Sequence, residues 1–130
     1  MKYKYFLFDW DGSLGATLPI WFEAFHKEFL KYGQKVDDLE IGKYIIGDWE
    51  GPRKYGVTDL DKFFSDIEVV TLEKLENVDL NPGVLDVLRM IKENKGKIAV
   101  VTTSRKRWVK GALRKNNIKD MLDVFLGKKM

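Results

Sequence analysis

The sequence predicts an α/β fold built on a parallel β-sheet. Short apolar runs at residues 5–8 and 97–101 each end in polar residues, and segments with helical periodicity separate these runs. Strands that alternate with helices form right-handed crossovers, which make the strands of one sheet parallel. A long helical stretch over residues 17–79 lies between the first two runs, and it predicts a helical insert after the first strand.

Composition narrows the class of protein. The 130 residues fit one modest domain or one domain with a small insert, and the absence of cysteine excludes disulfides and thiol catalysis. No stretch approaches the roughly 18 consecutive apolar residues that a membrane span needs. The N-terminus lacks the apolar core of a signal peptide, so we expect a cytoplasmic protein. A net charge of +3 suits anionic substrates and does not require nucleic acid.

The first strand is followed at once by two carboxylates and a glycine: Asp9, Asp11 and Gly12. Ligand chemistry collects at the carboxyl ends of parallel strands, so we expect both carboxylates to face a crevice. Two ionised carboxylates this close repel each other. Either a hard cation such as Mg²⁺ offsets their charge, or one pKa is raised and the pair becomes a nucleophile and a proton donor. An acidic turn without chemistry is the remaining alternative.

The stretch 17–79 has the pattern of a compact helical unit. Apolar residues recur at helical spacing up to Gly33, and we interpret this stripe as core in preference to an aromatic ligand pocket. The single histidine, His26, lies off the stripe and is interpreted as structural or surface. A second helix is predicted over 39–46, and Thr58 is predicted to cap a third that carries apolar residues from 60 to 67. Residues 69–75 form a further amphipathic stretch. The stripe comprises Leu18, Trp21, Phe22, Phe25, Phe29 and Tyr32.

The sheet-and-helix pattern resumes near residue 80. Asn81 is predicted to cap a helix that has Pro82 in its first turn and ends at Gly96. The second strand, 97–101, runs into three hydroxyl residues, of which Ser104 is predicted to cap the next helix. A third strand is predicted over 122–126. We therefore expect a sheet core made of residues 1–16 and 80–130 and a helical domain over 17–79.

The segment from Tyr5 to Leu14 resembles the first motif of the haloacid-dehalogenase-like (HAD) phosphohydrolases, an apolar strand followed by Asp, any residue, Asp, Gly, Ser or Thr, and Leu. Thr102, after the second strand, resembles the second motif, in which a hydroxyl binds the phosphoryl group. The resemblance implies a Rossmann-like core with a helical cap inserted after the first strand. It also implies Mg²⁺-dependent hydrolysis of a small phosphorylated metabolite, similar to that of phosphoglycolate-phosphatase-like enzymes.

The resemblance assigns roles to individual residues. Asp9 is the expected nucleophile and a metal ligand. Asp11 is the expected acid/base, with its backbone carbonyl also on the metal. Thr102, with Gly12 and Thr103 beside it, is expected to bind the substrate phosphoryl group. A carboxylate nucleophile divides hydrolysis into two easier steps through an aspartyl-phosphate, and the acid/base serves both steps.

Two motifs of the family are not evident. The third motif is a lysine that balances phosphate charge, for which Lys128 or Lys129 is a candidate, and nothing after Thr102 resembles the fourth, acidic motif. We therefore expect a core that is incomplete at its C-terminal end, impaired activity, and an open sheet edge that favours self-association. A noncatalytic fragment or pseudoenzyme is the main alternative, and a phosphomutase is a further one.

A cluster of basic residues around Trp108 raises a different function. Cations beside an aromatic ring can bind nucleic acid through phosphate contacts and stacking. Trp108 shares its helical face with Val109, Ala112 and Leu113, so the sequence predicts that it points inward and that the bases form the solvated side of the helix. We therefore disfavour nucleic-acid binding. The cluster comprises Arg105, Lys106, Arg107, Lys110, Arg114 and Lys115.

Overall fold

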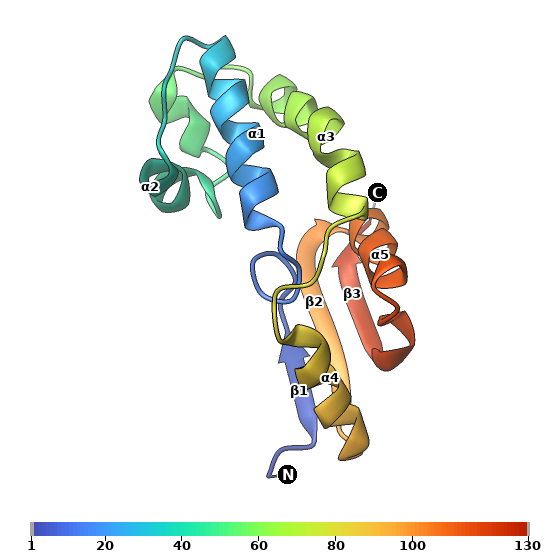
Figure 1. Ribbon diagram of the computed structural model, residues 1–130. Coiled ribbons are helices and arrows are strands. Elements are labelled where there is room, and N and C mark those ends of the chain that lie inside the picture. The colour runs from blue at the N-terminus through green and yellow to red at the C-terminus, as the bar shows by residue number, and fades with distance from the viewer. Residues whose placement is uncertain (1, 130) are drawn as a thin grey trace. The chain divides into compact units, whose positions relative to one another are not determined.

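The computed structural model describes residues 2–129, which form two compact units (Figure 1). The sheet unit contains the chain up to Leu18 and from Glu73 onward, and the helical unit is Pro19–Leu72. Residues 73–79, predicted within the helical insert, thus cluster with the sheet. The division of the chain into a HAD-like core and cap at residues 16/17 and 79/80 stays a prediction.

The sheet unit contains three parallel strands in the order β1-β2-β3. They are β1 Tyr5–Phe8, β2 Lys97–Arg105 and β3 Val124–Lys128. The register aligns Phe8 with Val100 and Val100 with Phe125. The predicted parallel α/β sheet is therefore confirmed. Strand β2 continues four residues past its predicted end, and β3 starts two residues later than predicted and also ends two residues later.

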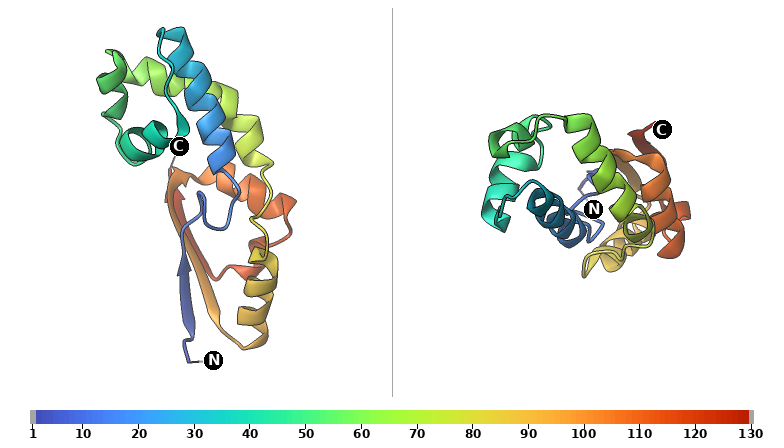
Figure 2. Two further views of the ribbon diagram at one scale, coloured as in Figure 1. Left: turned by 60° about the vertical axis from the view of Figure 1, so that its left-hand side comes forward. Right: turned by 90° about the horizontal axis from the view of Figure 1, so that it is seen from above.

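Two helices cover one face of this sheet, α4 Val84–Glu93 and α5 Lys106–Lys115, as the views in Figure 2 show. A short 3₁₀ turn, η3 Lys119–Met121, precedes β3. Alternate residues of β2 are buried beneath the helices, namely Ile98, Val100 and Thr102. Trp108 of α5 is 7% exposed, which confirms that it points inward.

The opposite side chains of the three strands form an apolar surface, which we call the exposed sheet face. It comprises Tyr5, Leu7, Ala99, Val101, Val124 and Leu126. Tyr5 is 80% exposed, Leu7 73% and Leu126 55%. The apolar runs that predicted buried strands are therefore buried on one side only within this chain.

The helical unit has an aromatic core of its own. Its elements are α1 Leu18–Lys31, α2 Asp38–Glu40, the π-helical turn η1 Ile41–Ile45, the 3₁₀ turn η2 Gly51–Tyr55 and α3 Leu60–Glu76, of which α1 and α3 extend into the sheet unit. Phe63 is fully buried, and its ring centroid lies 5.0 Å from that of Phe29 and 6.2 Å from that of Phe25. The interpretation of the α1 stripe as core is thus correct for Phe25 and Phe29.

Three predictions of local structure in this unit needed correction. The helix expected over 39–46 is split into α2 and the π-helical turn, and the segments 60–67 and 69–75 are one continuous helix. Asp59, not Thr58, caps that helix, because its Oδ1 accepts the backbone N–H of Lys62 at 3.0 Å. His26 is half-buried and pairs with Asp38.

Asp123 ties the start of β3 to β2 and should make the sheet acid-sensitive. Its Oδ2 accepts the backbone N–H of Ile98 at 2.8 Å and the ammonium of Lys92 at 2.9 Å. The Ile98 N–H, and then the charge of Lys92, hold the pKa of Asp123 below its usual range. A depressed pKa stabilises the fold above the unfolded-state value of about 4, and this contribution is lost as the pH falls through the folded-state pKa.

We expect Asp123→Asn to lower the free energy of unfolding at pH 7 and to reduce its fall between about pH 5 and pH 2. Urea unfolding across that pH range measures both effects. Asp120→Asn, at an exposed carboxylate three residues earlier, is the matched control and should keep the wild-type pH profile. An Asp123→Asn protein with an unchanged acid dependence would contradict this account.

Candidate active site

The first carboxylate stands immediately after β1. Asp9 is exposed, and its Oδ1 accepts the backbone N–H of Trp10 at 2.8 Å. Trp10 itself is only 2% exposed. The buried indole therefore anchors the chain directly after the strand, and it fixes the place from which the Asp9 carboxylate projects.

The loop after Trp10 is held by its own backbone. The Trp10 carbonyl accepts the N–H groups of Ser13 and Gly15, at 3.1 and 2.9 Å. Gly12 has φ +70°, a left-handed conformation that favours glycine, and its N–H donates to Thr17 Oγ1 at 3.2 Å. A Cβ at Gly15 would lie 2.6 Å from the Trp10 ring. Both glycines are thus needed for a tight loop that holds Asp11 in place.

Asn81, which lies outside this loop in the sequence, also stabilises it through hydrogen bonds. The Asn81 amide donates to the carbonyls of Ser13 and Gly15, at 2.8 and 3.3 Å, and its backbone N–H donates to the Leu14 carbonyl at 2.9 Å. The predicted role of Asn81 as a helix cap is therefore wrong. Helix α4 starts after Gly83, whose φ is +83°, and the Asn81 amide donates to the loop instead of to the helix.

The carboxyl end of β2 carries hydroxyl groups, at the same end of the sheet as Asp9 and Asp11. Thr102 is 9% exposed, and its Oγ1 accepts the backbone N–H of Ser104 at 3.0 Å. The Ser104 hydroxyl donates to Oδ2 of Asp11. Thr103, between them, is exposed. A chain of contacts therefore runs from Thr102 through Ser104 to Asp11, joining the ends of β1 and β2.

Sequence reasoning missed this use of Ser104. It predicted Ser104 as the cap of α5, but β2 continues to Arg105 and α5 begins at Lys106 without a side-chain cap. The helix start therefore does not follow Thr102 directly, as an anion site on its first N–H groups would require. In the sequence, the only indication of this role for Ser104 is the run of three hydroxyl residues, of which the first two are predicted to bind the phosphoryl group.

The donors present suit Mg²⁺ but do not enclose it. Asp9 offers a carboxylate oxygen and Asp11 a backbone carbonyl, and Mg²⁺ is commonly held by one or two carboxylates together with substrate phosphate and water. Within residues 2–129, no group of three or more histidine, cysteine or acidic side chains is placed to hold a metal ion. Lys128, the candidate for the third motif, is the last residue of β3 and pairs in register with Arg105.

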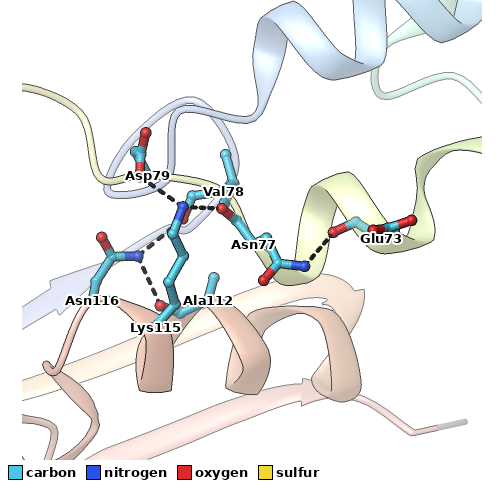
Figure 3. A network of polar contacts seen from close by, with 7 residues as sticks. All are labelled: Glu73, Asn77, Val78, Asp79, Ala112, Lys115 and Asn116. Carbon is cyan, nitrogen blue, oxygen red and sulfur yellow. Dashed lines mark hydrogen bonds and ion pairs between the residues drawn. The ribbon is translucent and has the colours of Figure 1, made fainter.

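Two of the basic residues around Trp108 contact the segment 76–79, at the end of α3 and just after it. Arg107 Nε lies 2.9 Å from Glu76 Oε1. Lys115 contacts the Asn77 carbonyl and lies 2.8 Å from Asp79 Oδ1 (Figure 3). The Asn116 amide adds a hydrogen bond of 2.9 Å to the Val78 carbonyl. Part of the cluster is thus used within the fold, which weakens the case for a nucleic-acid surface.

Comparison with known proteins places the chain in a family. Residues 6–130 match the family described as haloacid dehalogenase-like hydrolase, and the chain belongs to it. The resemblance read from the sequence is thereby confirmed.

Individual relatives are similar to this chain in sequence or in fold, and the chain spans about three fifths of their length. A phosphorylated carbohydrates phosphatase from Thermotoga maritima is 26% identical over 127 residues, which cover 92% of this chain and 59% of that protein. The structure of a candidate phosphoglycolate phosphatase from Lactobacillus plantarum has a TM-score of 0.80 at 18% identity, over 98% of this chain and 62% of that one. CbbY from Rhodobacter sphaeroides, in complex with phosphate, gives 0.71 at 20% identity, with 95% and 63% covered.

Proposed function

We propose that this chain carries the catalytic carboxylates of a Mg²⁺-dependent phosphomonoester hydrolase for a small phosphorylated metabolite. The observation that supports the proposal best is the meeting of two strand ends. Asp9 and Asp11 follow β1, Thr102 ends the apolar part of β2, and Ser104 links that end to Asp11. In parallel sheets, ligands bind at the carboxyl ends of the strands.

The proposed chemistry uses the carboxylates in sequence. An oxygen of Asp9 attacks phosphorus and forms a P–O bond, while the bond to the substrate alkoxide breaks and Asp11 gives that alkoxide a proton. Asp11 then removes a proton from water, whose oxygen attacks phosphorus and displaces Asp9 as a free carboxylate. Asp9 and Asp11 would hold Mg²⁺, which would supply positive charge to offset that of the phosphate.

The neighbouring groups position these reactants. The Ser104 hydroxyl, by donating to Asp11, holds the acid/base carboxylate in one orientation. Thr102 and Thr103 are the proposed donors to the phosphoryl oxygens. Gly12, expected beside them, lies in the same loop, where its backbone N–H donates to the Gly15 carbonyl and Thr17 Oγ1. The tight loop that Trp10 and Gly15 form fixes the carboxylates before substrate binds, so little reorganisation is needed during the reaction.

The relatives support the substrate class, and their length bears on activity. The Thermotoga relative is named for phosphorylated carbohydrates. Because this chain spans 59% of it, we propose that residues 1–130 alone hydrolyse such substrates poorly. A noncatalytic member of the family is the second candidate, favoured by the absence of a three-ligand acidic cluster within residues 2–129.

Among the residues that the structure describes, no helix is both long and apolar enough to cross a membrane.

Binding of a phosphoryl mimic tests the proposal without requiring turnover. We expect BeF₃⁻ with Mg²⁺ to bind to Asp9, seen as a bound ¹⁹F resonance, and the signal to be lost in Asp9→Asn. Thr102→Val should weaken binding about tenfold, since it removes one hydrogen bond to a charged group. Thr58→Val, at an exposed threonine of the helical unit, is the control. Equal binding by wild type, Asp9→Asn and Thr102→Val would refute the assignment.

A further inference from the structure

We propose that one stripe of helix α5 positions the loop that carries Asp11, although no residue of the stripe belongs to the candidate active site. The stripe holds segment 76–81, and this segment holds loop 11–15, all within the sheet unit. That the loop serves catalysis rests on the proposed function, whereas the contacts between α5 and the loop do not. The stripe comprises Arg107, Gly111, Lys115 and Asn116.

The stripe follows from the spacing of its residues along the helix. Arg107, Gly111 and Lys115 are four residues apart, and residues at this spacing lie on one face of a helix. Arg107 Nε lies 2.9 Å from Glu76 Oε1, and Lys115, two turns further on, contacts the Asn77 carbonyl. This face of α5 is therefore directed at the end of α3 and the residues after it.

Gly111 shows how closely α5 approaches this segment. A glycine inside a helix is less favourable than alanine by about 1 kcal/mol, so its presence there needs a packing reason. A Cβ at Gly111 would lie 3.0 Å from the carbonyl oxygen of Glu76 and 3.1 Å from its Cβ. The glycine therefore leaves the room that the backbone at Glu76 occupies against α5.

The end of α5 fixes the next residues of the segment (Figure 3). Lys115 Nζ lies 2.8 Å from Asp79 Oδ1, and the Asn116 amide donates to the Val78 carbonyl at 2.9 Å. The Lys115–Asp79 pair is exposed, and such pairs add little to the free energy of unfolding. Together with the contact between Lys115 and the Asn77 carbonyl, these bonds instead fix the direction of three successive residues.

The fixed segment pairs with the loop through its backbone. The Asp79 carbonyl accepts the N–H of Ala16 at 2.9 Å, and Leu80 forms an antiparallel bridge with Gly15. Asn81 adds its amide hydrogen bonds to two loop carbonyls. The segment thus contacts α5 on one side and the loop on the other, so the position of the loop depends on α5.

Hydrogen exchange of the Ala16 amide measures this dependence in the full 130-residue chain without requiring activity. We expect Lys115→Met/Asn116→Ala to speed the exchange about tenfold, an effect comparable to one lost hydrogen bond. Gly111→Ala, which displaces the segment but favours the helix, should also speed it. Lys115→Arg keeps the charge and the donors and should keep the wild-type rate. Arg114→Met, at an exposed cation of the same helix, is the matched control.

Two further readouts separate positioning from general stability. Asp123→Asn weakens the contact between β2 and β3 and leaves segment 76–81 intact, so it should not speed exchange at Ala16. Binding of BeF₃⁻ with Mg²⁺, followed by its ¹⁹F resonance, should be about tenfold weaker in folded Lys115→Met/Asn116→Ala than in wild type. A wild-type chain that does not bind BeF₃⁻ would refute the proposed function, and exchange at Ala16 would then decide the role of α5.

Three results would overturn the positioning role. One is unchanged exchange at Ala16 in both Lys115→Met/Asn116→Ala and Gly111→Ala, since the loop would then hold itself. Another is equal acceleration in Asp123→Asn, since α5 would then serve only the stability of the fold. The third is faster exchange at Ala16 with wild-type affinity for BeF₃⁻, since the contacts with α5 would then not serve the site.

Discussion

Assayed with Mg²⁺ and p-nitrophenyl phosphate, the 130-residue chain is expected to turn over on the order of 10²–10³ times more slowly than the same chain joined to the remaining part of a relative's core. Asp9 and Asp11 present few oxygens to an ion that prefers six ligands, and Lys128 lies on β3, two strands away from β1. Charge stabilisation in the transition state is often the largest catalytic term, so a missing cation or ligand is costly.

The variant Asp9→Asn separates this expectation from its alternatives. It should abolish turnover by the joined protein and remove any residual turnover by the chain alone, while circular dichroism stays unchanged because Asp9 is exposed. Robust hydrolysis by the unjoined chain that disappears in Asp9→Asn would contradict the expected impairment and show that the chain's own residues complete the site. Activity that persists in Asp9→Asn would point to a contaminating phosphatase.

The second large effect is expected in the core of the helical unit. Phe63 is fully buried, and its ring packs within 5.0–6.2 Å of four others, those of Phe25, Phe29, Tyr32 and Phe64. Truncation of a buried phenylalanine costs about 3–5 kcal/mol, and lost aromatic pairs add to this. Typical domains are stable by only about 5–15 kcal/mol. We therefore expect Phe63→Ala to unfold Pro19–Leu72 near room temperature.

The four tryptophans make this result measurable unit by unit. Trp21 and Trp49 belong to the helical unit, and Trp10 and Trp108 to the sheet unit. In protein labelled with 5-fluorotryptophan, Phe63→Ala should move the first two ¹⁹F resonances to their unfolded positions and leave the other two in place. Leu39→Ala, at an exposed site, should change nothing. Loss of all four native resonances in Phe63→Ala would show that the two units unfold together.

The sequence predicted the parallel sheet and the end of β1 because their signals are local. An apolar run that ends in Asp9-Trp10-Asp11-Gly12 marks a strand and its functional end without further information. The parallel order followed from the alternation of strands with helices. The family's motifs then indicated which polar residues at the strand ends are candidates for the active site.

The roles of Asn81 and Ser104 were mispredicted because each has two plausible partners. Both have side chains that cap helices well, and sequence reasoning gave each to the next helix along the chain. In the structure the Asn81 amide reaches loop carbonyls 66 and 68 residues away, and the Ser104 hydroxyl reaches a carboxylate 93 residues away. Contacts this distant depend on the folded sheet, which periodicity and capping rules do not describe.

The pairing of β1 with β2 has a consequence for how the chain folds. Tyr5 is aligned with Lys97, so this ladder closes a loop of roughly 90 residues. In contrast, α4, β2, α5 and β3 are neighbours along the chain, with only the turn η3 between the last two. Contacts between distant residues form late, because the entropy of loop closure opposes them until the partner is in place. During synthesis, β1 leaves the ribosome before β2 and stays unpaired until β2 has been made, whereas the helices between them can fold in the meantime. The strand that positions Asp9 is thus expected to dock late in folding and to be among the first to detach.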